Sequence, residues 1–120
     1  YCFAEKQGYS KFGSYTGNGS TSDGAFVYTG FSPAWVLMKR TSGTEAWMLV
    51  DNKRPGFNVI DDVLEPNDSA AEGASTDIDL LSNGFKLRKD NSNVSGETYI
   101  YMAFAESPFV SSKGVPTTAR

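Results

Sequence analysis

The sequence of 120 residues contains no histidine and a single cysteine, Cys2. The missing histidine removes the commonest general base, the Ser-His and Cys-His nucleophile pairs, and every zinc site that needs an imidazole. One cysteine cannot form an internal disulfide, and Cys2 has no second cysteine nearby, so we interpret it as an inert strand residue. Much of enzyme chemistry is therefore excluded by composition alone.

Positive charge and long apolar runs are also scarce. Eleven Lys and Arg against 14 Asp and Glu give a net charge of -3, which is the wrong sign for a domain that binds nucleic acid through its phosphates. No apolar run approaches the roughly 18 residues of a membrane span, and the N-terminus lacks the basic and apolar regions of a signal peptide. We expect a soluble chain with neither a nucleic-acid partner nor membrane insertion. Because the first residue is Tyr1 and not Met, we also expect a fragment, a processed chain or part of a longer protein.

The composition and the hydrophobic pattern favour strands and turns. The chain has 12 glycines and many Ser, Thr, Asn and Asp residues, whereas Ala and Leu are sparse outside a few clusters. Apolar residues alternate with a period of two, which predicts strands over 25–29, 35–39, 47–50, 85–88 and 98–105, with two more over 11–15 and 76–81. Seven to eight short strands at roughly 10-residue spacing predict one all-β domain, an antiparallel β-sandwich with a jelly-roll-like arrangement.

Two segments between the strands carry specific expectations. The dipeptide Asn83-Gly84 predicts a tight hairpin, because a type I′ turn needs positive φ at both central residues. The segment 53–75 loses the alternation and is rich in Pro, Asn, Asp, Ala and Gly. We interpret it as a long loop, of the kind that is often functional, with a short helical turn around residues 70–72.

The beginning of the chain is similar to its end. Tyr1-Cys2-Phe3-Ala4-Glu5 matches the pattern of Met102-Ala103-Phe104-Ala105-Glu106, which suggests an internal repeat. We therefore predict that residues 1–9 are the closing strand and linker of a preceding repeat, residues 10–110 the sandwich, and residues 111–120 a C-terminal tail. The alternative is chance similarity of two short aromatic strands.

Four sequence runs support a family resemblance: GYSKFGSYTGNG at 8–19, FSPAWVLMKR at 31–40, LSNGFKLR at 81–88 and YIYMAFAE at 99–106. In this order they resemble a repeat domain of tail-fibre and other tail-associated proteins of marine bacteriophages. The resemblance implies a module on the virion surface, assembled in the host cytoplasm, with identical subunits in a homotrimer and other virion proteins as partners. It brings no catalytic residues and no assigned ligand-binding residues.

Carboxylates are the plentiful acid-base groups, and a glycosidase needs two of them facing each other. No motif marks a pair, and acidic side chains are common in solvated turns, so we interpret the candidates as solvated: Asp51, Asp61, Asp62, Glu65, Asp77 and Asp79. Oxygen ligands cluster in part of this set, and the alternative is a calcium site at Asp61, Asp62, Glu65, Asn67 and Asp68. No EF-hand-like spacing supports it, and we expect no cofactor.

Aromatic and basic side chains supply the candidate ligand-binding residues. Tyr99 and Tyr101 share one face of the strand 98–105, opposite Ile100, Met102 and Phe104, and we select the tyrosine side as a candidate contact surface. The basic side chains Lys86 and Arg88 are candidate contacts for an anionic glycan, although solvated strand faces also explain them.

Tryptophan faces often bind sugar rings, yet each tryptophan shares a strand face with a leucine. Trp35 lies on the side of Leu37, and Trp47 on the side of Leu49, so we assign both indoles to the core. At 13% aromatic residues, some of a larger aromatic set should still remain outside and favour interfaces: Phe12, Tyr15, Tyr28, Tyr99, Tyr101 and Phe109.

The leading hypothesis is a non-enzymatic structural or adhesin module of a phage tail fibre or related virion appendage, which contacts host surface glycans or proteins. Two alternatives stay open. One is a carbohydrate-active, depolymerase-type domain that uses paired carboxylates, and the other is a capsid decoration or head-fibre module.

Overall fold

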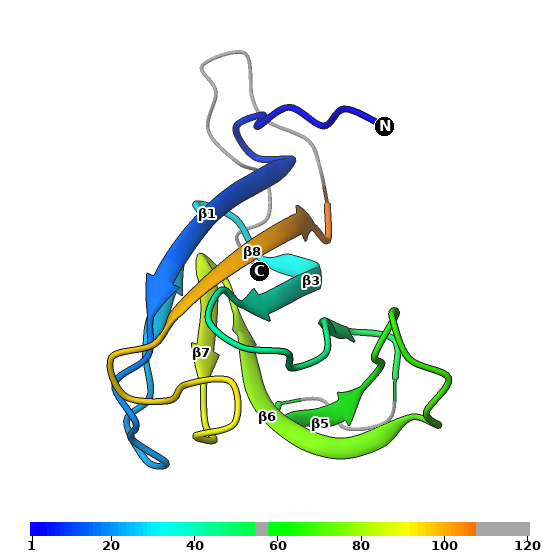
Figure 1. Cartoon of the computed structure of the whole chain (residues 1–120). Coiled ribbons are helices and arrows are strands. Elements are labelled where there is room, and N and C mark those ends of the chain that lie inside the picture. Colours follow the sequence, from blue (N-terminus) through cyan, green and yellow to red (C-terminus); the bar gives the residue numbers. More distant parts are fainter. Residues whose placement is uncertain (55–57, 108–120) are drawn as a thin grey trace.

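The computed structural model describes residues 1–54 and 58–107, with the backbone alone described at 75–77. The described residues form strands and no helix (Figure 1). The eight strands are β1 (Ser10–Thr16), β2 (Phe26–Tyr28), β3 (Pro33–Arg40), β4 (Met48–Asp51), β5 (Ile60–Val63), β6 (Gly73–Leu81), β7 (Gly84–Leu87) and β8 (Thr98–Ala105). Accordingly, no described segment offers a helix with the length and apolarity of a membrane span.

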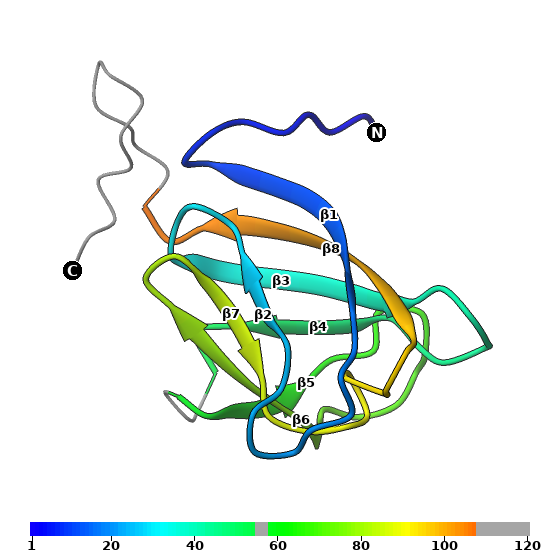
Figure 2. The ribbon, with the colours of Figure 1, turned by 90° about the vertical axis from the view of Figure 1, so that its left-hand side faces the viewer.

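The strands form two four-stranded sheets that pack face to face as an antiparallel β-sandwich (Figure 2). The first sheet has the order β1-β8-β3-β4, and the second has the order β2-β7-β6-β5. β1 pairs with β8 and β2 pairs with β7, which joins strands from the two ends of the chain, whereas β3–β4 and β5–β6 pair as chain neighbours. The predicted fold class is confirmed.

All seven strands predicted from alternation are present, and the structure adds β5 within the predicted 53–75 loop. A register shift between Ile60 and Asp62 places Ile60 and Val63, three positions apart, both in the core. A bulge of this kind breaks the period of two, so the alternation rule does not detect the strand. The predicted helical turn around residues 70–72 is wrong, since these residues lead into the extended β6.

The predicted hairpin is confirmed, but its turn is displaced by one residue. Leu81 pairs with Gly84, so the two central residues are Ser82 and Asn83, and neither has positive φ. The type I′ geometry is therefore wrong, and Gly84 is needed for a different reason. A Cβ at Gly84 would lie 2.1 Å from the carbonyl oxygen of Val27, so a glycine allows β2 to approach β7.

The core lies between the two sheets, with contributions from both. The inner side of the first sheet supplies Tyr15, Val36, Met38, Val50, Tyr99, Tyr101 and Ala103. The second sheet and the β2–β3 connection supply Val27, Phe31, Ile60, Val63, Ile78, Leu80, Phe85 and Leu87.

The two long sides of the sandwich differ. On the β4–β5 side, Leu49 and Leu64 exchange two backbone hydrogen bonds of 2.8 and 3.0 Å, which join the sheets. On the opposite side, β1 and β2 are edge strands of different sheets. This second side is where a ligand or a partner has access to the space between the sheets.

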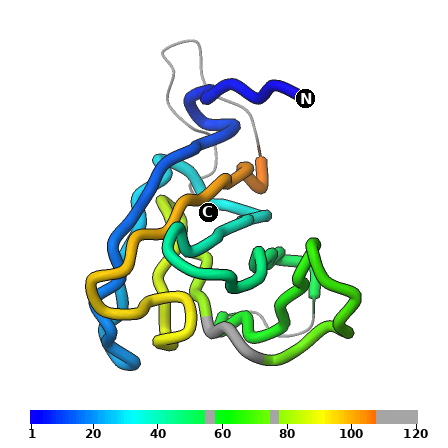
Figure 3. Tube along the Cα trace, viewed as in Figure 1, coloured from blue at the N-terminus to red at the C-terminus, as the bar shows by residue number. Residues whose placement is uncertain are grey.

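At one end of the sandwich the loop 90–96 lies against the loop 17–24 (Figure 3). The fully buried Asn93 side chain joins them: its Nδ2 donates to Asn18 Oδ1 (2.7 Å) and to the Ser20 carbonyl (2.9 Å), and its Oδ1 accepts from the Asn18 amide (3.0 Å). The stacked core tyrosines Tyr15 and Tyr99 bind the loop 90–96 from the core side. A buried polar network whose groups are all hydrogen-bonded makes the loops that it joins rigid.

Candidate functional site

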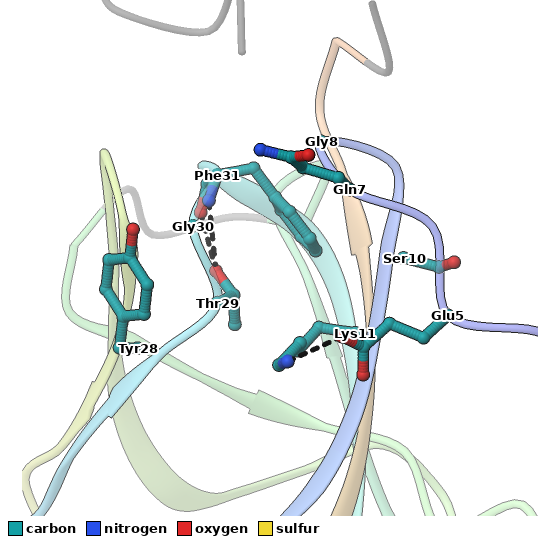
Figure 4. A pocket seen from close by; sticks show the side chains of 9 residues that line it. All are labelled: Glu5, Gln7, Gly8, Ser10, Lys11, Tyr28, Thr29, Gly30 and Phe31. Atoms are coloured by element: carbon teal, nitrogen blue, oxygen red, sulfur yellow. Dashed lines mark hydrogen bonds and ion pairs between the residues drawn. The ribbon is translucent and has the colours of Figure 1, made fainter. Parts of the chain in front are cut away.

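A cleft of about 360 Å³ opens between the edge strands β1 and β2 (Figure 4). Residues from the N-terminal segment, β1 and the β2–β3 connection line it: Glu5, Gln7, Gly8, Ser10, Lys11, Tyr28, Thr29, Gly30 and Phe31. The Tyr28 ring stands on one side, and Lys11 with Glu5 lies opposite. The cleft is therefore shared between the sandwich and the segment that precedes it.

The side chains around this cleft combine an aromatic face with polar groups. The Tyr28 side chain is 64% exposed, and within the described residues neither its hydroxyl nor the Gln7 amide has a hydrogen-bond partner. Lys11 Nζ donates to Glu5 Oε1 at 2.6 Å. This bond holds the pKa of the Glu5 carboxyl below its ordinary value and raises the pKa of Lys11, so both groups are charged at neutral pH. An exposed ring with nearby donors and acceptors suits a sugar better than an apolar ligand.

A second surface lies on the outer face of the first sheet. Five aromatic rings, which we call the outer aromatic cluster, meet there: Phe3, Tyr9, Phe12, Trp35 and Phe104. Phe104 is central, with ring centroids at 5.5 Å from Trp35, 6.0 Å from Tyr9, 6.2 Å from Phe12 and 6.3 Å from Phe3.

Apolar residues continue this outer face along the sheet. The strand register places Met102 of β8 beside both Phe12 and Leu37, and Leu37 beside Leu49. Ile100 on the same side of β8 is 41% exposed. The outer face of a sandwich sheet is ordinarily polar, so an apolar face of this size indicates a contact surface.

The assignment of Trp35 and Trp47 to the core is wrong, because both side chains are only half-buried. Trp35 packs on Phe104 on the outer face, while its neighbours Val36 and Met38 fill the core. Both faces of β3 carry apolar residues, and the alternation gives no sign of which face meets the second sheet.

The selection of the tyrosine side of β8 as a contact surface is also wrong. Tyr99 is 0% and Tyr101 7% exposed, because this side of β8 faces the second sheet. The Tyr99 ring stacks on Tyr15, with centroids 4.9 Å apart, and the hydroxyl of Tyr15 donates to the Ser92 carbonyl at 2.8 Å. The Tyr99 oxygen accepts from the Val94 amide at 3.2 Å. These rings support the loop 90–96 from within the core.

Lys86 and Arg88 are brought close to acidic side chains. Lys86 forms an ion pair with Asp23, and this bond lowers the pKa of the Asp23 carboxyl. Arg88 Nε donates to Asp79 Oδ2 at 2.6 Å, and Asp79 is only 6% exposed. Each candidate basic residue thus has an acidic partner in the fold, which weakens the case for binding an anionic glycan.

Several candidate acids and candidate calcium ligands have defined polar partners in the fold. Asp51 accepts from Arg54 Nε at 2.9 Å, and Arg54 also bonds Glu72. Asn67 Oδ1 accepts from the Trp47 amide, and Asp68 Oδ1 accepts from the Ala70 amide. The side chain of Asp77 lies outside the described residues, as does Phe109. Among the side chains that are described, no group of three His, Cys, Asp or Glu is placed to hold a metal ion.

At the opposite end of the sandwich a second cleft of about 420 Å³ is lined by Arg40, Glu45, Ala46, Met48, Glu65, Asp68, Asn91 and Tyr99. Its basic residue, Arg40, contacts the β3–β4 loop: it forms an ion pair with Glu45, and its Nε donates to the Ser42 carbonyl at 2.7 Å. Mixed charge in mutual contact makes this cleft a weaker candidate than the one at Tyr28.

Comparison with known proteins gives one family. A family model described as "Domain of unknown function (DUF7483)" matches residues 1–108. No curated protein and no solved structure matches the chain. The match includes residues 1–9 together with the sandwich, and the assignment of these residues to a preceding repeat stays a prediction.

Proposed function

We propose that this chain, which belongs to the DUF7483 family, is a non-enzymatic interaction module of a virion appendage, with a tail fibre as the first choice. The observation that carries the proposal is the apolar outer face of the first sheet, where five aromatic rings gather around Phe104. A sandwich with a large aromatic outer face is suited to contact another protein surface. The resemblance to phage tail-associated repeats supports the virion as its location.

Catalysis is not part of the proposal, because the acids with defined partners serve the fold. Asp51 and Asp79 are each bonded to an arginine, and Glu5 is bonded to Lys11. Incubation of the protein with host surface polysaccharide should release no reducing ends. Steady release that one Asp substitution abolishes would establish the depolymerase-type alternative instead.

The location is tested on virions. Antibodies raised against the module should decorate a fibre or another appendage of purified virions in immunogold electron microscopy, and preincubation with the free module should remove the label. Label confined to the capsid surface favours a head-fibre or decoration module. Virions that carry no copy of the chain by mass spectrometry contradict the proposal.

The assembly is proposed to contain identical subunits, with a homotrimer as the first choice, because closed cyclic symmetry is the usual way for identical chains to bury a shared surface. Mass photometry of the full-length protein should report a trimer. A monomer at all concentrations contradicts this part of the proposal and leaves the location open.

The cleft at Tyr28 favours a second role, contact with a neutral glycan. The exposed Tyr28 ring offers a stacking face, while Gln7, Glu5 and Lys11 offer donors and acceptors for hydroxyl groups. On a glycan array, Tyr28→Ala should lose roughly tenfold in affinity for any glycan that the wild type binds. Phe26→Ala is the matched control, since Phe26 is exposed on the same strand and does not line the cleft. Equal losses in both variants contradict this role.

A further inference from the structure

The N-terminal segment has the sequence of the end of β8. Phe3-Ala4-Glu5 is identical to Phe104-Ala105-Glu106, and Cys2 corresponds to Ala103, which is fully buried in the core. In β8 this pattern places a small residue inward and a phenylalanine outward. The segment 1–5 therefore carries the residue types of a strand that covers a core on one side and presents an aromatic ring on the other.

In the structure this segment is not a strand, and its residues are exposed. Tyr1 and Cys2 are exposed, and Phe3 is 62% exposed. Such a run of exposed apolar residues ordinarily marks a surface that another element covers. A sheet to which the segment could belong is absent from the described part of this chain.

The segment is nevertheless held in place on the sandwich. The Phe3 ring contacts both Phe12 and Phe104, at 6.3 Å in each case. Ser10 Oγ donates to the Ala4 carbonyl at 2.9 Å, and Lys11 pairs with Glu5. The outer aromatic cluster and β1 therefore form a binding site for a Phe-Ala-Glu segment, which we call the seat, with two contacts for the ring, one for the backbone and one for the carboxylate.

We propose that this seat is the junction between two copies of the domain in series. The end of β8 of one copy serves as residues 1–5 of the next, so that Phe104 of the first copy packs on Phe12 and Phe104 of the second. The same ring then belongs to the outer aromatic cluster of its own copy and to that of its neighbour. Consecutive copies are joined by a continuous row of aromatic contacts, with the carboxylate of Glu106 paired to Lys11 of the following copy.

The inference rests on the proposed function and deepens it, because it names a second copy of the domain as the protein surface that the outer aromatic cluster contacts. A packed junction of this kind makes a row of domains stiff. Its test needs no virion, so its failure leaves the proposed location untouched. In the same way, an absence of the chain from virions leaves the junction between copies untouched.

The test compares two tandem proteins. In the fused tandem, residue 106 of the first copy is followed directly by residue 6 of the second, which puts Phe104 in the seat of Phe3. In the linker tandem, two complete chains are joined by a flexible Gly-Ser linker, and each copy keeps its own Phe3. Phe104→Ala in the first copy should lower the melting temperature of the fused tandem by about 2 °C or more beyond its effect in the linker tandem, because it removes ring contacts in both copies.

Phe26→Ala in the first copy is the control, since Phe26 is exposed on β2 and lies outside the outer aromatic cluster. It should lower the melting temperature of both tandems equally. The proposal is overturned if Phe104→Ala also has equal effects in the two tandems. It is overturned as well if the fused tandem does not fold while the linker tandem does, because the seat then cannot accept the end of a strand.

Discussion

At the scale of the residue, one buried amide connects two loops. The Asn93 side chain bonds Asn18 and Ser20, and its Oδ1 lies within 3.4 Å of the Ala25 amide. Asn93→Ala should cost about 2–4 kcal/mol, because it leaves several buried donors and acceptors without partners. Urea denaturation measures the loss. The exposed Asn91, whose side chain accepts one bond from the next amide, is the control, and Asn91→Ala should cost less than about 1 kcal/mol. Equal losses would show that burial of the amide does not matter.

Tyr15 gives the stability a dependence on alkaline pH. Burial in the core raises the pKa of its phenol, and burial also raises the pKa of Tyr101. In the unfolded chain a tyrosine ionises near pH 10. Below that pH both states hold the proton and the stability is complete; above it the unfolded chain loses its proton first, so stability falls as pH rises.

We predict that the unfolding free energy decreases between about pH 10 and 11.5. Urea denaturation at a series of fixed pH values measures this decrease. Tyr15→Phe should reduce the slope in this window and retain the part that Tyr101 contributes. Because the Tyr15 hydroxyl also bonds the Ser92 carbonyl, the variant should start from a lower stability at pH 7. An unchanged slope above pH 10 would contradict the assignment.

At the scale of the element, the β6–β7 hairpin depends on contact with β2. The Asn83 carbonyl accepts from the amides of Thr29 and Gly30, at 3.0 and 3.2 Å. The turn is thus bound to the end of β2, and Gly84 sits where the two strands approach most closely. In the dipeptide Asn83-Gly84, the glycine is therefore explained by the packing of β2 on β7 and not by the turn geometry.

Gly84→Ala should destabilise the domain by about 1–3 kcal/mol, because the new methyl group forces β2 away from β7. Gly73→Ala is the matched control, since a Cβ at this β6 position meets no atom within 4 Å. It should change the stability by less than about 0.5 kcal/mol. Thermal unfolding of both variants checks the pair, and a tolerated Gly84→Ala would show that the strands can separate at little cost.

At the scale of the whole molecule, the two sheets share one core and should unfold together. The core is filled from both sheets, and the Leu49–Leu64 bridge joins them at one side. Both tryptophans belong to the first sheet, with Trp35 in β3 and Trp47 next to β4. Tryptophan fluorescence therefore reports one sheet, while far-ultraviolet circular dichroism reports both. Their urea midpoints should coincide, and a separation would mean that the sheets unfold independently.

The fold class could be predicted before the structure was known, because alternation and turn residues are local properties of the chain. Seven of the strands follow from period-two patterns that each element carries in its own residues. The absence of histidine likewise excluded catalytic and zinc sites that need an imidazole, and this follows from composition alone. The alternation did not predict the strand β5. Its bulge, and hence the burial of both Ile60 and Val63, exists only when β5 pairs with β6.

Which face of a strand lies inside depends on tertiary packing and could not be predicted from the pattern of the strand. In β8 one face carries Tyr99 and Tyr101 and the other carries Met102 and Phe104, and both faces are apolar enough to fill a core. Alternation separates two faces but does not rank them, and the choice is made by the sheet that packs against them. Tyr99 and Tyr101, two of the selected contact residues, are therefore in the core. The outer aromatic cluster is assembled from β1, β3, β8 and the N-terminal segment, so it forms only when distant parts of the chain come together.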